Sequence, residues 1–524
     1  MIKKSYLKIF LLLFTAIPLF SQEEVNSAFT GSFGSVTLND QIYNHFSFRP
    51  EMSLGKLGLG MDLYFYFDED GRLYSDNWNF SSSENSFRTI VDKIYYIRWG
   101  QPFDDMYFRF GALPNVTMGH GSLVKNYSNV IDYPRYRRKG ITFNYNISDV
   151  SVQFIHSDFK EVNAPSLLAL STDFEFVDKF SLNMTIATDS DQYNGLFDSD
   201  DDGYPDIIDD FPNEDNYWHD NQLLIEQFES DKTDLGSPCH DSLTNDIVDL
   251  DPINGLDDAC DEIISNLQTA MDDAYDSSPV LGGNNDISGL SFGLSYGLTS
   301  RFTIYSEFTQ LFGKTSNPYI QGTDLEYSTY DRELGYGFIP LGFKAEWDRV
   351  TFAIDYRQNT EKFLFHYWDE NYDNARIKLA GTSAVTKEEN LYKYGKAQGV
   401  KFSLSGNIKY VSVSFSYNHM NTDIWDSSSR TYISDDNNSI YAKLDIDTSM
   451  LNQVRIAEMF YQQRNISDPF SFDPNEDTLF GYNLGIDMSD NMVLILKGRK
   501  SFLCSENDDC DAVKTTQIET QIIF

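Results

Sequence analysis

The sequence predicts an all-β chain that crosses a membrane as an antiparallel β-barrel of about 16–20 strands. Short segments alternate apolar and polar side chains, the connections alternate between short turns and long polar loops, and the first residues are typical of an export signal. The chain holds 33 Tyr and 40 Phe, yet only 41% of its residues are hydrophobic. A barrel with an apolar outer band and a polar lumen explains this mixture, whereas a soluble chain of this length would be expected to split into several domains.

Residues 1–21 predict a secretory signal peptide. Three lysines within the first eight residues precede the apolar run 9–20 and the small Ser21. This run is shorter than the roughly 20 apolar residues of a membrane-spanning helix, and no cysteine follows it as in a lipoprotein. We therefore expect cleavage near residue 22 and a barrel formed from residues 22–524.

Five segments show the strand alternation most clearly. Large apolar or aromatic residues take every second position, and Gly, Ser, Asn, Thr, Asp, Ala or Tyr takes most of the others. The segments are 57–67, 180–186, 288–298, 350–356 and 411–417. A wet lumen tolerates such a polar face, and the core of a soluble sandwich does not, so the alternation favours a barrel over a soluble all-β protein.

The connections between these segments are of two kinds. Short turns are predicted at 55–56, 103–105, 148–149, 178–179, 299–300, 348–349, 407–409 and 490–491. Longer polar loops are predicted at 69–87, 113–138, 158–164, 190–286, 313–333, 360–397, 421–437, 464–477 and 504–511. Short turns on one side and long loops on the other are typical of barrels whose turns face the periplasm and whose loops face the exterior.

The last segment, 515–524, reads TTQIETQIIF and has an alternating pattern that ends on Phe524. It resembles the C-terminal signature of Gram-negative outer-membrane barrels, in which the assembly machinery reads a last strand ending in Phe. The resemblance implies an outer-membrane location with loops at the cell surface. It also implies contact with outer-membrane lipid and lipopolysaccharide, and recognition by the barrel assembly machinery through this strand.

Residues 190–286 form a large acidic insertion with one Lys or Arg, Lys232. By strand parity the insertion leaves the barrel on the extracellular side. Its core, 198–215, reads DSDDDGYPDIIDDFPNED and places carboxylates at positions 1, 3, 5, 9 and 12 of a loop, with Gly at position 6. This spacing wraps oxygen ligands around one hard cation. The candidate metal ligands are Asp198, Asp200, Asp202, Asp206, Asp209 and the carbonyl of Tyr204.

The core of the insertion resembles a thrombospondin type 3 repeat, whose acidic pattern is followed by Cys-Pro. Here Phe211-Pro212 replaces Cys-Pro, which removes the disulfide anchor of the repeat and keeps the acidic ligands. The resemblance implies bound Ca²⁺, and the alternative is an acidic disordered loop. A second acidic stretch, 249–258, has degenerate spacing and is either a weaker calcium site or solvated charge.

Four cysteines in an exported chain predict two disulfides. Cys239 and Cys260 flank the second acidic stretch, and a helical spacing of apolar residues follows over 256–271. Cys504 and Cys510 lie in the last extracellular loop with five residues between them. We expect these two pairings from proximity, and the other two connectivities remain open.

The loop 113–138 and the residues just after it hold the densest basic cluster of the mature chain: Arg135, Arg137, Arg138 and Lys139. By our count this is the third extracellular loop, the one that folds inward in classical porins. Opposed basic and acidic side chains can set a transverse field at a pore constriction, so these residues are candidates for that role. The alternative is a salt-bridged patch or a patch that faces lipopolysaccharide.

His120 and Ser122 of the same loop stand two residues apart, as in the His-x-Ser pair of outer-membrane phospholipases. The Asn-Gly expected directly after the serine is absent, because Leu123-Val124 follow. We therefore assign no catalytic residue and expect a protein that is not an enzyme. The expected cofactor is the Ca²⁺ of the acidic insertion.

The net charge of −40 argues against nucleic acid as a partner. The first functional expectation is a porin-like channel for small solutes with a calcium-ordered surface loop. The alternative is a surface binding or adhesion barrel with a closed lumen, and an outer-membrane lipase-like enzyme is less favoured. Small polar residues on the lumen side favour an open pore over a closed barrel.

Overall fold

A computed structural model describes most of the chain. The described residues are 26–38, 41–68, 70–74, 78–102, 104–131, 137–160, 165–195, 210–211, 217–231, 263–271, 286–315, 332–380, 383–426, 428–429, 431–448, 453–468, 473–475, 478–489, 492–504 and 510–523. The predicted signal peptide, the calcium loop 198–209, the second acidic stretch, Arg135, Cys239 and Cys260 lie outside them.

The described strands form one continuous antiparallel sheet of 21 strands. The strands are β1 (Asn26–Leu38), β2 (Gln41–Leu54), β3 (Leu57–Met61), β4 (Leu63–Phe67), β5 (Ile94–Trp99), β6 (Met106–Gly111), β7 (Gly140–Ile147), β8 (Val150–His156), β9 (Leu168–Val177), β10 (Phe180–Asp189), β11 (Ile287–Gly297), β12 (Phe302–Phe312), β15 (Tyr336–Trp347), β16 (Val350–Asn359), β19 (Tyr394–Ile408), β20 (Val411–Asp426), β21 (Thr431–Ile446), β22 (Val454–Ile466), β23 (Leu479–Ser489), β24 (Met492–Cys504) and β25 (Cys510–Ile523).

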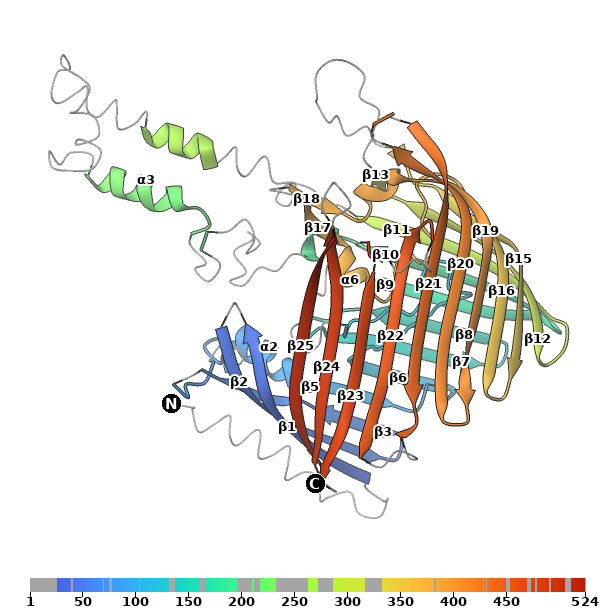
Figure 1. Ribbon diagram of the computed structural model, residues 1–524, viewed down its shortest axis with the longest axis horizontal. Helices are drawn as coiled ribbons and strands as arrows, with labels where there is room; N and C mark the ends of the chain where they lie inside the picture. The colour runs from blue at the N-terminus through green and yellow to red at the C-terminus, as the bar shows by residue number, and fades with distance from the viewer. Residues whose placement is uncertain are drawn as a thin grey trace.

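The sheet closes on itself. β1 pairs with β25, from Thr30 opposite Ile523 to Gly34 opposite Glu519, so the first and last strands are neighbours (Figure 1). β3 and β4 are separated by one residue and both pair with β2, which makes them one interrupted strand of the wall. Counted this way the wall has about 20 strands. The predicted transmembrane-type antiparallel barrel is confirmed as a fold, at the upper end of the expected range.

The remaining elements are short and lie in the connections. They are α2 (Ser83–Asp92), η3 (Gln192–Gly195), α3 (Asp220–Asp231), a helix at 263–271, β13 (Lys314–Thr315), β14 (Arg332–Glu333), α6 (Tyr372–Ala375), β17 (Ile377–Ala380), β18 (Ser383–Thr386) and η4 (Glu389–Lys393). The helix at 263–271 falls within the range whose apolar spacing predicted a helix. In the described part of the chain, no helix has the length and apolar character needed to cross a membrane.

Side chains alternate between the two faces of the wall as the sequence predicts. In β11, Ile287 and Ser291 are buried inside the barrel, whereas Phe292 and Leu294 are 42% and 45% exposed on the outside. Phe292 lies beside Met184 and Phe308 on the flanking strands, so apolar residues of neighbouring strands form a common outer surface. Such an outer face suits lipid, because exposed apolar area there is not in contact with water.

The two kinds of connection lie at opposite ends of the barrel. Tight turns such as Leu54–Leu57 and Ile147–Val150 join strands at the end where β25 finishes, and the long connections lie at the other end. The acidic insertion leaves from that other end, after Asp189 and before Ile287. The predicted asymmetry between short turns and long loops is therefore present in the fold.

One predicted loop is wrong. The sequence predicts a loop over 421–437, but β20 and β21 continue their pairing as far as Asp426 opposite Thr431. Polar residues take most positions of 421–437, and the apolar pairs Ile424–Ile433 and Trp425–Tyr432 are too few to show alternation, while the backbone pairing of the ladder continues. Alternation reports which face meets an apolar environment, so it misses a hairpin whose two faces are both in water.

The apolar core lies inside the barrel and is built mostly from loops. Its buried members are Leu113, Val116, Met118, Leu123, Val124, Tyr127, Ile155, Leu167, Ala169, Ala187, Ile287, Leu311, Leu334, Phe363, Tyr367, Trp368, Tyr372 and Leu391. Residues of the loops 112–131 and 360–376 pack here against inward side chains of the wall. The loop 112–131 therefore folds into the lumen, as expected from its position as the third extracellular loop.

The outward apolar band is expected to determine insertion into a membrane. The substitution Phe292→Arg, near the middle of β11, should lower the free energy of unfolding by about 2–4 kcal/mol, because it places a charge in the lipid-facing band. The measurement is urea unfolding of the barrel refolded in lipid vesicles.

The matched control for this substitution is Ser405→Arg. Ser405 is an exposed residue on the same face of β19 as the inward Lys401. A lumen-facing arginine stays hydrated, so the control should change the free energy of unfolding by less than about 1 kcal/mol. Equal effects of the two substitutions would show that Phe292 does not face lipid.

Candidate functional site

Two loops meet in the middle of the lumen and form one structure, which we call the internal partition (residues 112–131 and 360–376). Val124 and Trp368 form a parallel bridge. The Lys125 amide donates to the Trp368 carbonyl at 3.0 Å, and the His366 amide donates to the Ser122 carbonyl at 2.7 Å. The Trp368 side chain is fully buried. Backbone pairing and an apolar core thus join two loops that are more than 200 residues apart in the chain.

Buried polar contacts fix the partition in position. The Tyr127 hydroxyl donates to a carboxylate oxygen of Asp373 at 3.0 Å, and the Arg138 guanidinium lies 3.4 Å from the other oxygen of Asp373. The Asp373 side chain is fully buried. A buried carboxylate needs such partners, because without them its desolvation is not offset.

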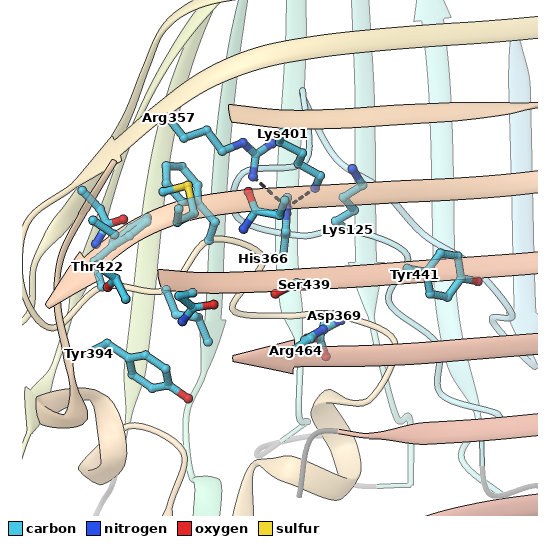
Figure 2. A pocket seen from close by; sticks show the side chains of 18 of the residues that line it. Lys125, Arg357, His366, Asp369, Tyr394, Lys401, Thr422, Ser439, Tyr441 and Arg464 are labelled. Atoms are coloured by element: carbon cyan, nitrogen blue, oxygen red, sulfur yellow. Dashed lines mark hydrogen bonds and ion pairs between the residues drawn. The ribbon is translucent and has the colours of Figure 1, made fainter. Parts of the chain in front are cut away.

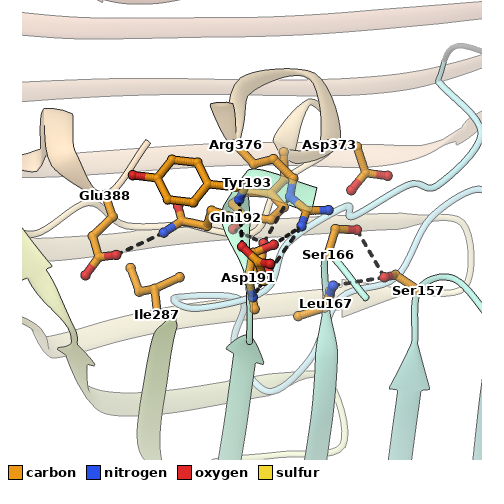
Figure 3. A network of polar contacts seen from close by, with 12 residues as sticks. Ser157, Ser166, Leu167, Asp191, Gln192, Tyr193, Ile287, Asp373, Arg376 and Glu388 are labelled. Atoms are coloured by element: carbon orange, nitrogen blue, oxygen red, sulfur yellow. Dashed lines mark hydrogen bonds and ion pairs between the residues drawn. The ribbon is translucent and has the colours of Figure 1, made fainter. Parts of the chain in front are cut away.

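A second network ties the partition to the end of β10 and to the connection that follows it. Arg376 forms an ion pair with Asp189 at 3.2 Å, and Gln192 donates from its amide to Glu388 at 2.9 Å (Figure 3). The Tyr367 hydroxyl donates to the Gln192 side-chain oxygen at 2.9 Å. Burial raises the pKa of the Glu388 carboxyl to about 8. These contacts place the base of the acidic insertion directly against the partition.

The predicted constriction residues are used in packing. The Arg137 guanidinium lies 3.4 Å from the centre of the Tyr64 ring and donates to the Tyr66 hydroxyl at 2.7 Å. Lys139 is 2% exposed. The Arg137 contacts anchor the loop to β4 of the wall, and the Arg138–Asp373 pair joins it to the other loop of the partition. These contacts do not show whether the basic residues set a transverse electric field at a pore constriction, so that role stays a prediction.

A cavity of about 350 Å³ lies between the partition and the inner face of β16 and β19–β22 (Figure 2). Its charged lining is strongly positive although the whole chain has a net charge of −40. The basic residues of the lining are Lys125, Arg357, Lys387, Lys393, Lys401 and Arg464, and the acidic ones are Asp369 and Glu370. The cavity therefore concentrates positive charge inside an acidic protein.

His366 is the centre of the basic side of this cavity. Its Nε2 lies 2.8 Å from the Arg357 guanidinium and also within hydrogen-bonding distance of the Lys401 ammonium (Figure 2). Its Nδ1 faces the Gly121 carbonyl. Arginine and protonated lysine only donate, so Nε2 accepts and the ring proton lies on Nδ1. Burial, reinforced by the Lys401 and Arg357 charges, lowers the pKa of His366 well below its usual value and keeps the ring neutral.

Two carboxylates of the wall lie near this group, because Glu307 of β12 is also close enough to Arg357 to interact with its charge. Asp355 forms an ion pair with Arg357 and accepts a hydrogen bond from the Tyr305 hydroxyl at 2.9 Å. Lys401 is 5% and Arg357 2% exposed, and Lys125 lies on the same side of the cavity (Figure 2). Burial and the Arg357 charge lower the pKa of Lys125. The cationic cluster, defined as Lys125, Arg357 and Lys401, thus has three basic groups beside two wall carboxylates, Asp355 and Glu307.

His120 and Ser122 do not form a catalytic pair. His120 Nε2 lies 2.8 Å from the Ser295 hydroxyl, and its ring stacks on Tyr305 with the ring centres 4.1 Å apart. The Ser122 hydroxyl pairs instead with Thr309 at 2.5 Å. A nucleophilic serine needs its base within hydrogen-bonding reach, and His120 is paired with Ser295 and not with Ser122.

Several predicted site residues can be placed only in part. Within the described part of the chain, no group of His, Cys, Asp or Glu has the geometry of a metal site. The calcium loop falls outside those residues, so its metal ligands stay predictions. Cys504 lies directly opposite Cys510 in the ladder of β24 and β25, and no free cysteine occurs among the described residues. This register is compatible with the predicted bridge.

Sequence reasoning missed the cationic cluster. Its members are far apart in the chain and come from a loop and two strands. A signal was present on the strands, because Asp355, Arg357 and Lys401 occupy inward positions, and Asp355 pairs directly with Lys401 in the register. Charged residues on the inward face of neighbouring strands are a mark of a lumen site. The contribution of Lys125 depends on how the loop folds and leaves no such mark.

No family model matches the chain, and no curated protein matches it. Matching solved structures include the outer membrane protein opdK from Pseudomonas aeruginosa, with 9% identity, a TM-score of 0.30 and coverage of 96% of this chain and 99% of that one. OccAB4 of Acinetobacter baumannii matches with 9% identity, a TM-score of 0.34 and coverage of 96% and 99%. The siderophore receptor PirA from Pseudomonas aeruginosa matches with 10% identity, a TM-score of 0.32 and coverage of 96% and 81%. At such values the likeness carries no argument about function, and the fold rests on the strand pairing of this chain.

The Asp373 contacts are expected to hold the partition together. Asp373→Ala should destabilise it locally by about 3–5 kcal/mol, because Arg138 loses its buried partner. The measurement is hydrogen exchange of the amides in 360–376, which should become faster while the strands of the wall stay protected.

Asp70→Ala is the matched control, because it also removes an aspartate from an ion pair with arginine. The Asp70–Arg72 pair is 70% and 79% exposed and should contribute about 0–1 kcal/mol. Unchanged exchange over 360–376 in Asp373→Ala would mean that the apolar core alone positions the partition.

Proposed function

We propose that this protein is an outer-membrane channel for small solutes, in which the internal partition narrows the lumen. The observation that carries the proposal is a closed barrel of about 20 strands whose lumen holds a positively lined cavity of about 350 Å³ beside the partition. Barrels of 16–18 strands leave an aqueous channel, and 22-stranded barrels have a plugged lumen. A barrel of intermediate size with two inward loops suits passage of selected small molecules.

The outer surface supports a location in the Gram-negative outer membrane. Apolar residues such as Phe292, Leu294 and Phe308 are exposed on the outside of the wall. The same proposal includes contact with outer-membrane lipid and lipopolysaccharide, loops at the cell surface and assembly through the last strand. The alternating outward residues of β25, among them Ile518 with 54% exposure, support the role of that strand.

A binding or adhesion barrel with a closed lumen is the second candidate. The tight packing of the partition favours it, because Tyr367, Trp368 and Tyr372 are fully buried at its centre. A catalytic function has no such support. His120 contacts Ser295 and Ser122 contacts Thr309, so both side chains have a structural role. Conductance separates the channel from the closed barrel.

The acidic insertion is proposed to bind Ca²⁺ through Asp198, Asp200, Asp202, Asp206, Asp209 and the Tyr204 carbonyl. The spacing of the carboxylates supports this. Carboxylates held close together repel one another, and a divalent cation offsets that repulsion and orders the loop. The contacts of Gln192 with Glu388 and Tyr367 join the start of the insertion to the partition, so an ordered loop could act on the lumen.

The channel and its calcium dependence are tested in one bilayer experiment. The refolded full chain should give stable conductance in a planar bilayer, because the lumen leaves an aqueous path. Removal of calcium by a chelator should change the size or gating of that conductance. The doubly substituted Asp200→Asn/Asp202→Asn protein should show the same behaviour with and without calcium, because both substitutions weaken the ligand set.

Asp234→Asn/Asp241→Asn is a matched control, since these acids lie in the same insertion but outside the calcium spacing. It should keep the response to calcium. A barrel that stays heat-modifiable on a gel but gives no conductance in any condition would refute the channel and favour the closed binding barrel.

The pair Cys504 and Cys510 is proposed to form a disulfide that closes the last hairpin. Their direct opposition in the ladder supports the bridge. Peptide mapping of the protein without reductant should yield a linked peptide containing both cysteines. Recovery of Cys504 linked to Cys239 or Cys260 would establish one of the other connectivities and contradict the proposed pair.

A further inference from the structure

We infer that the cavity beside the partition is a binding site for solutes that carry an oxyanion group, a carboxylate or a phosphate, and that the cationic cluster holds this group. The inference rests on the proposed channel and names the chemical class of its solute. Three features of the cavity support it, namely its charge balance, the hydrogen-bond donors at the cluster and the size of the space.

The charge balance of the lining favours an anion. Six basic residues and two acidic residues line the cavity, and two further carboxylates, Asp355 and Glu307, lie near the cluster in the wall. Asp369 is already engaged, since it pairs with Arg464. Cations that are nearly buried repel one another more strongly than in water, because the local dielectric constant is low. An anion in the cavity offsets this repulsion.

Two donors of the cluster share one acceptor atom. Arg357 and Lys401 both donate to Nε2 of His366, so two cationic donors share one neutral lone pair. A carboxylate or phosphate oxygen is a much stronger acceptor for such donors, and its hydrogen bonds with them are about twice as strong as neutral ones. Arg357 and Lys401 can therefore turn part of their donor capacity to an oxyanion while His366 stays in place through Gly121.

Lys125 adds the third donor from the partition. Its backbone is fixed by the hydrogen bond to the Trp368 carbonyl, and its side chain lies near Arg357 and Lys401 (Figure 2). The oxyanion would thus be held between the wall, which contributes Arg357 and Lys401, and the partition, which contributes Lys125. A site built across both parts exists only when the loop is folded inward.

The size of the cavity limits the ligand. About 350 Å³ is near the lower end of the range for small-molecule pockets, so the solute is compact. Phe363, Phe365 and Met420 also line the space, and the Phe365 ring centre lies 4.8 Å from the Arg357 guanidinium. They leave room for a small uncharged portion beside the oxyanion, and they contribute no negative charge that would repel it.

Lysine substitutions test this site in the refolded full chain. The measurements are the reversal potential in a KCl gradient, and the block of KCl current by added inorganic phosphate or malonate, with glycerol as the uncharged probe. The wild-type channel should prefer chloride to potassium and be blocked by phosphate, by malonate or by both. The stronger of the two blockers identifies the oxyanion, and glycerol should have no effect.

Lys401→Gln and Lys125→Gln should each weaken the block by roughly tenfold or more, because each removes a charge-assisted hydrogen bond. Lys401→Arg keeps the charge and should retain the chloride preference. Lys344→Gln is the matched control, since Lys344 pairs with Glu346 at 2.6 Å and does not line the cavity, and its block should equal that of the wild type. Heat modification on a gel establishes that each variant is folded.

The outcomes separate the inference from the proposed function. A conducting wild type whose block and selectivity are unchanged in both Gln variants would overturn the anion site and leave the channel intact. A wild type without conductance would refute the channel. In that case calorimetric titration of the detergent-solubilised protein with phosphate and malonate decides on the site, because binding that weakens in Lys401→Gln supports it and no binding overturns it.

Discussion

Closure of the backbone hydrogen-bond ladder is the constraint on which the rest of this structure depends. In a bilayer every backbone N–H and C=O group needs a partner within the protein, so an open sheet edge is not tolerated. The pairing of β1 with β25 removes the last edge, although these strands come from opposite ends of the chain. Once the wall is closed, alternation along each strand separates a lipid-facing side from an enclosed side. The enclosed side then becomes the place where polar and charged residues can gather.

The enclosed space is used in two ways. Part of it is filled by a conventional apolar core, in which Trp368 and Tyr367 from one loop pack with Leu123 and Val124 from another. The other part is a polar cavity whose basic residues come from the wall and from the partition. The apolar core gives the loops a fixed position, because ordering a loop costs conformational entropy that buried contacts must offset. The fixed loops then bring Lys125 and His366 to Arg357 and Lys401.

The charge distribution gives the cavity its character. The chain as a whole is strongly acidic, and the acids are densest in the insertion at one end of the barrel. Arg357 and Lys401 of the cavity lining are nearly buried, so their effect on a solute is larger than that of exposed charges. The contacts of Gln192 and Arg376 connect the base of the insertion to the partition. A conformational change at the base of the insertion would therefore be transmitted through these contacts to the residues that line the cavity.

The inward fold of the loop 113–138 is expected only by comparison with the third extracellular loop of porins. The sequence by itself determined the barrel and the division into short turns and long loops. These follow from local patterns, because a period of two reports which face of a strand meets lipid. It was wrong over 421–437, where most residues of the hairpin are polar and no apolar alternation marks the strands. Only the tertiary structure decided the site. In the fold, Arg138 pairs with Asp373 and Arg137 packs on Tyr64. The cavity brings together Lys125, Arg357, His366 and Lys401, which come from loops and strands. Such a cluster depends on how closed strands and folded loops approach one another in space, and local periodicity carries no information about that approach.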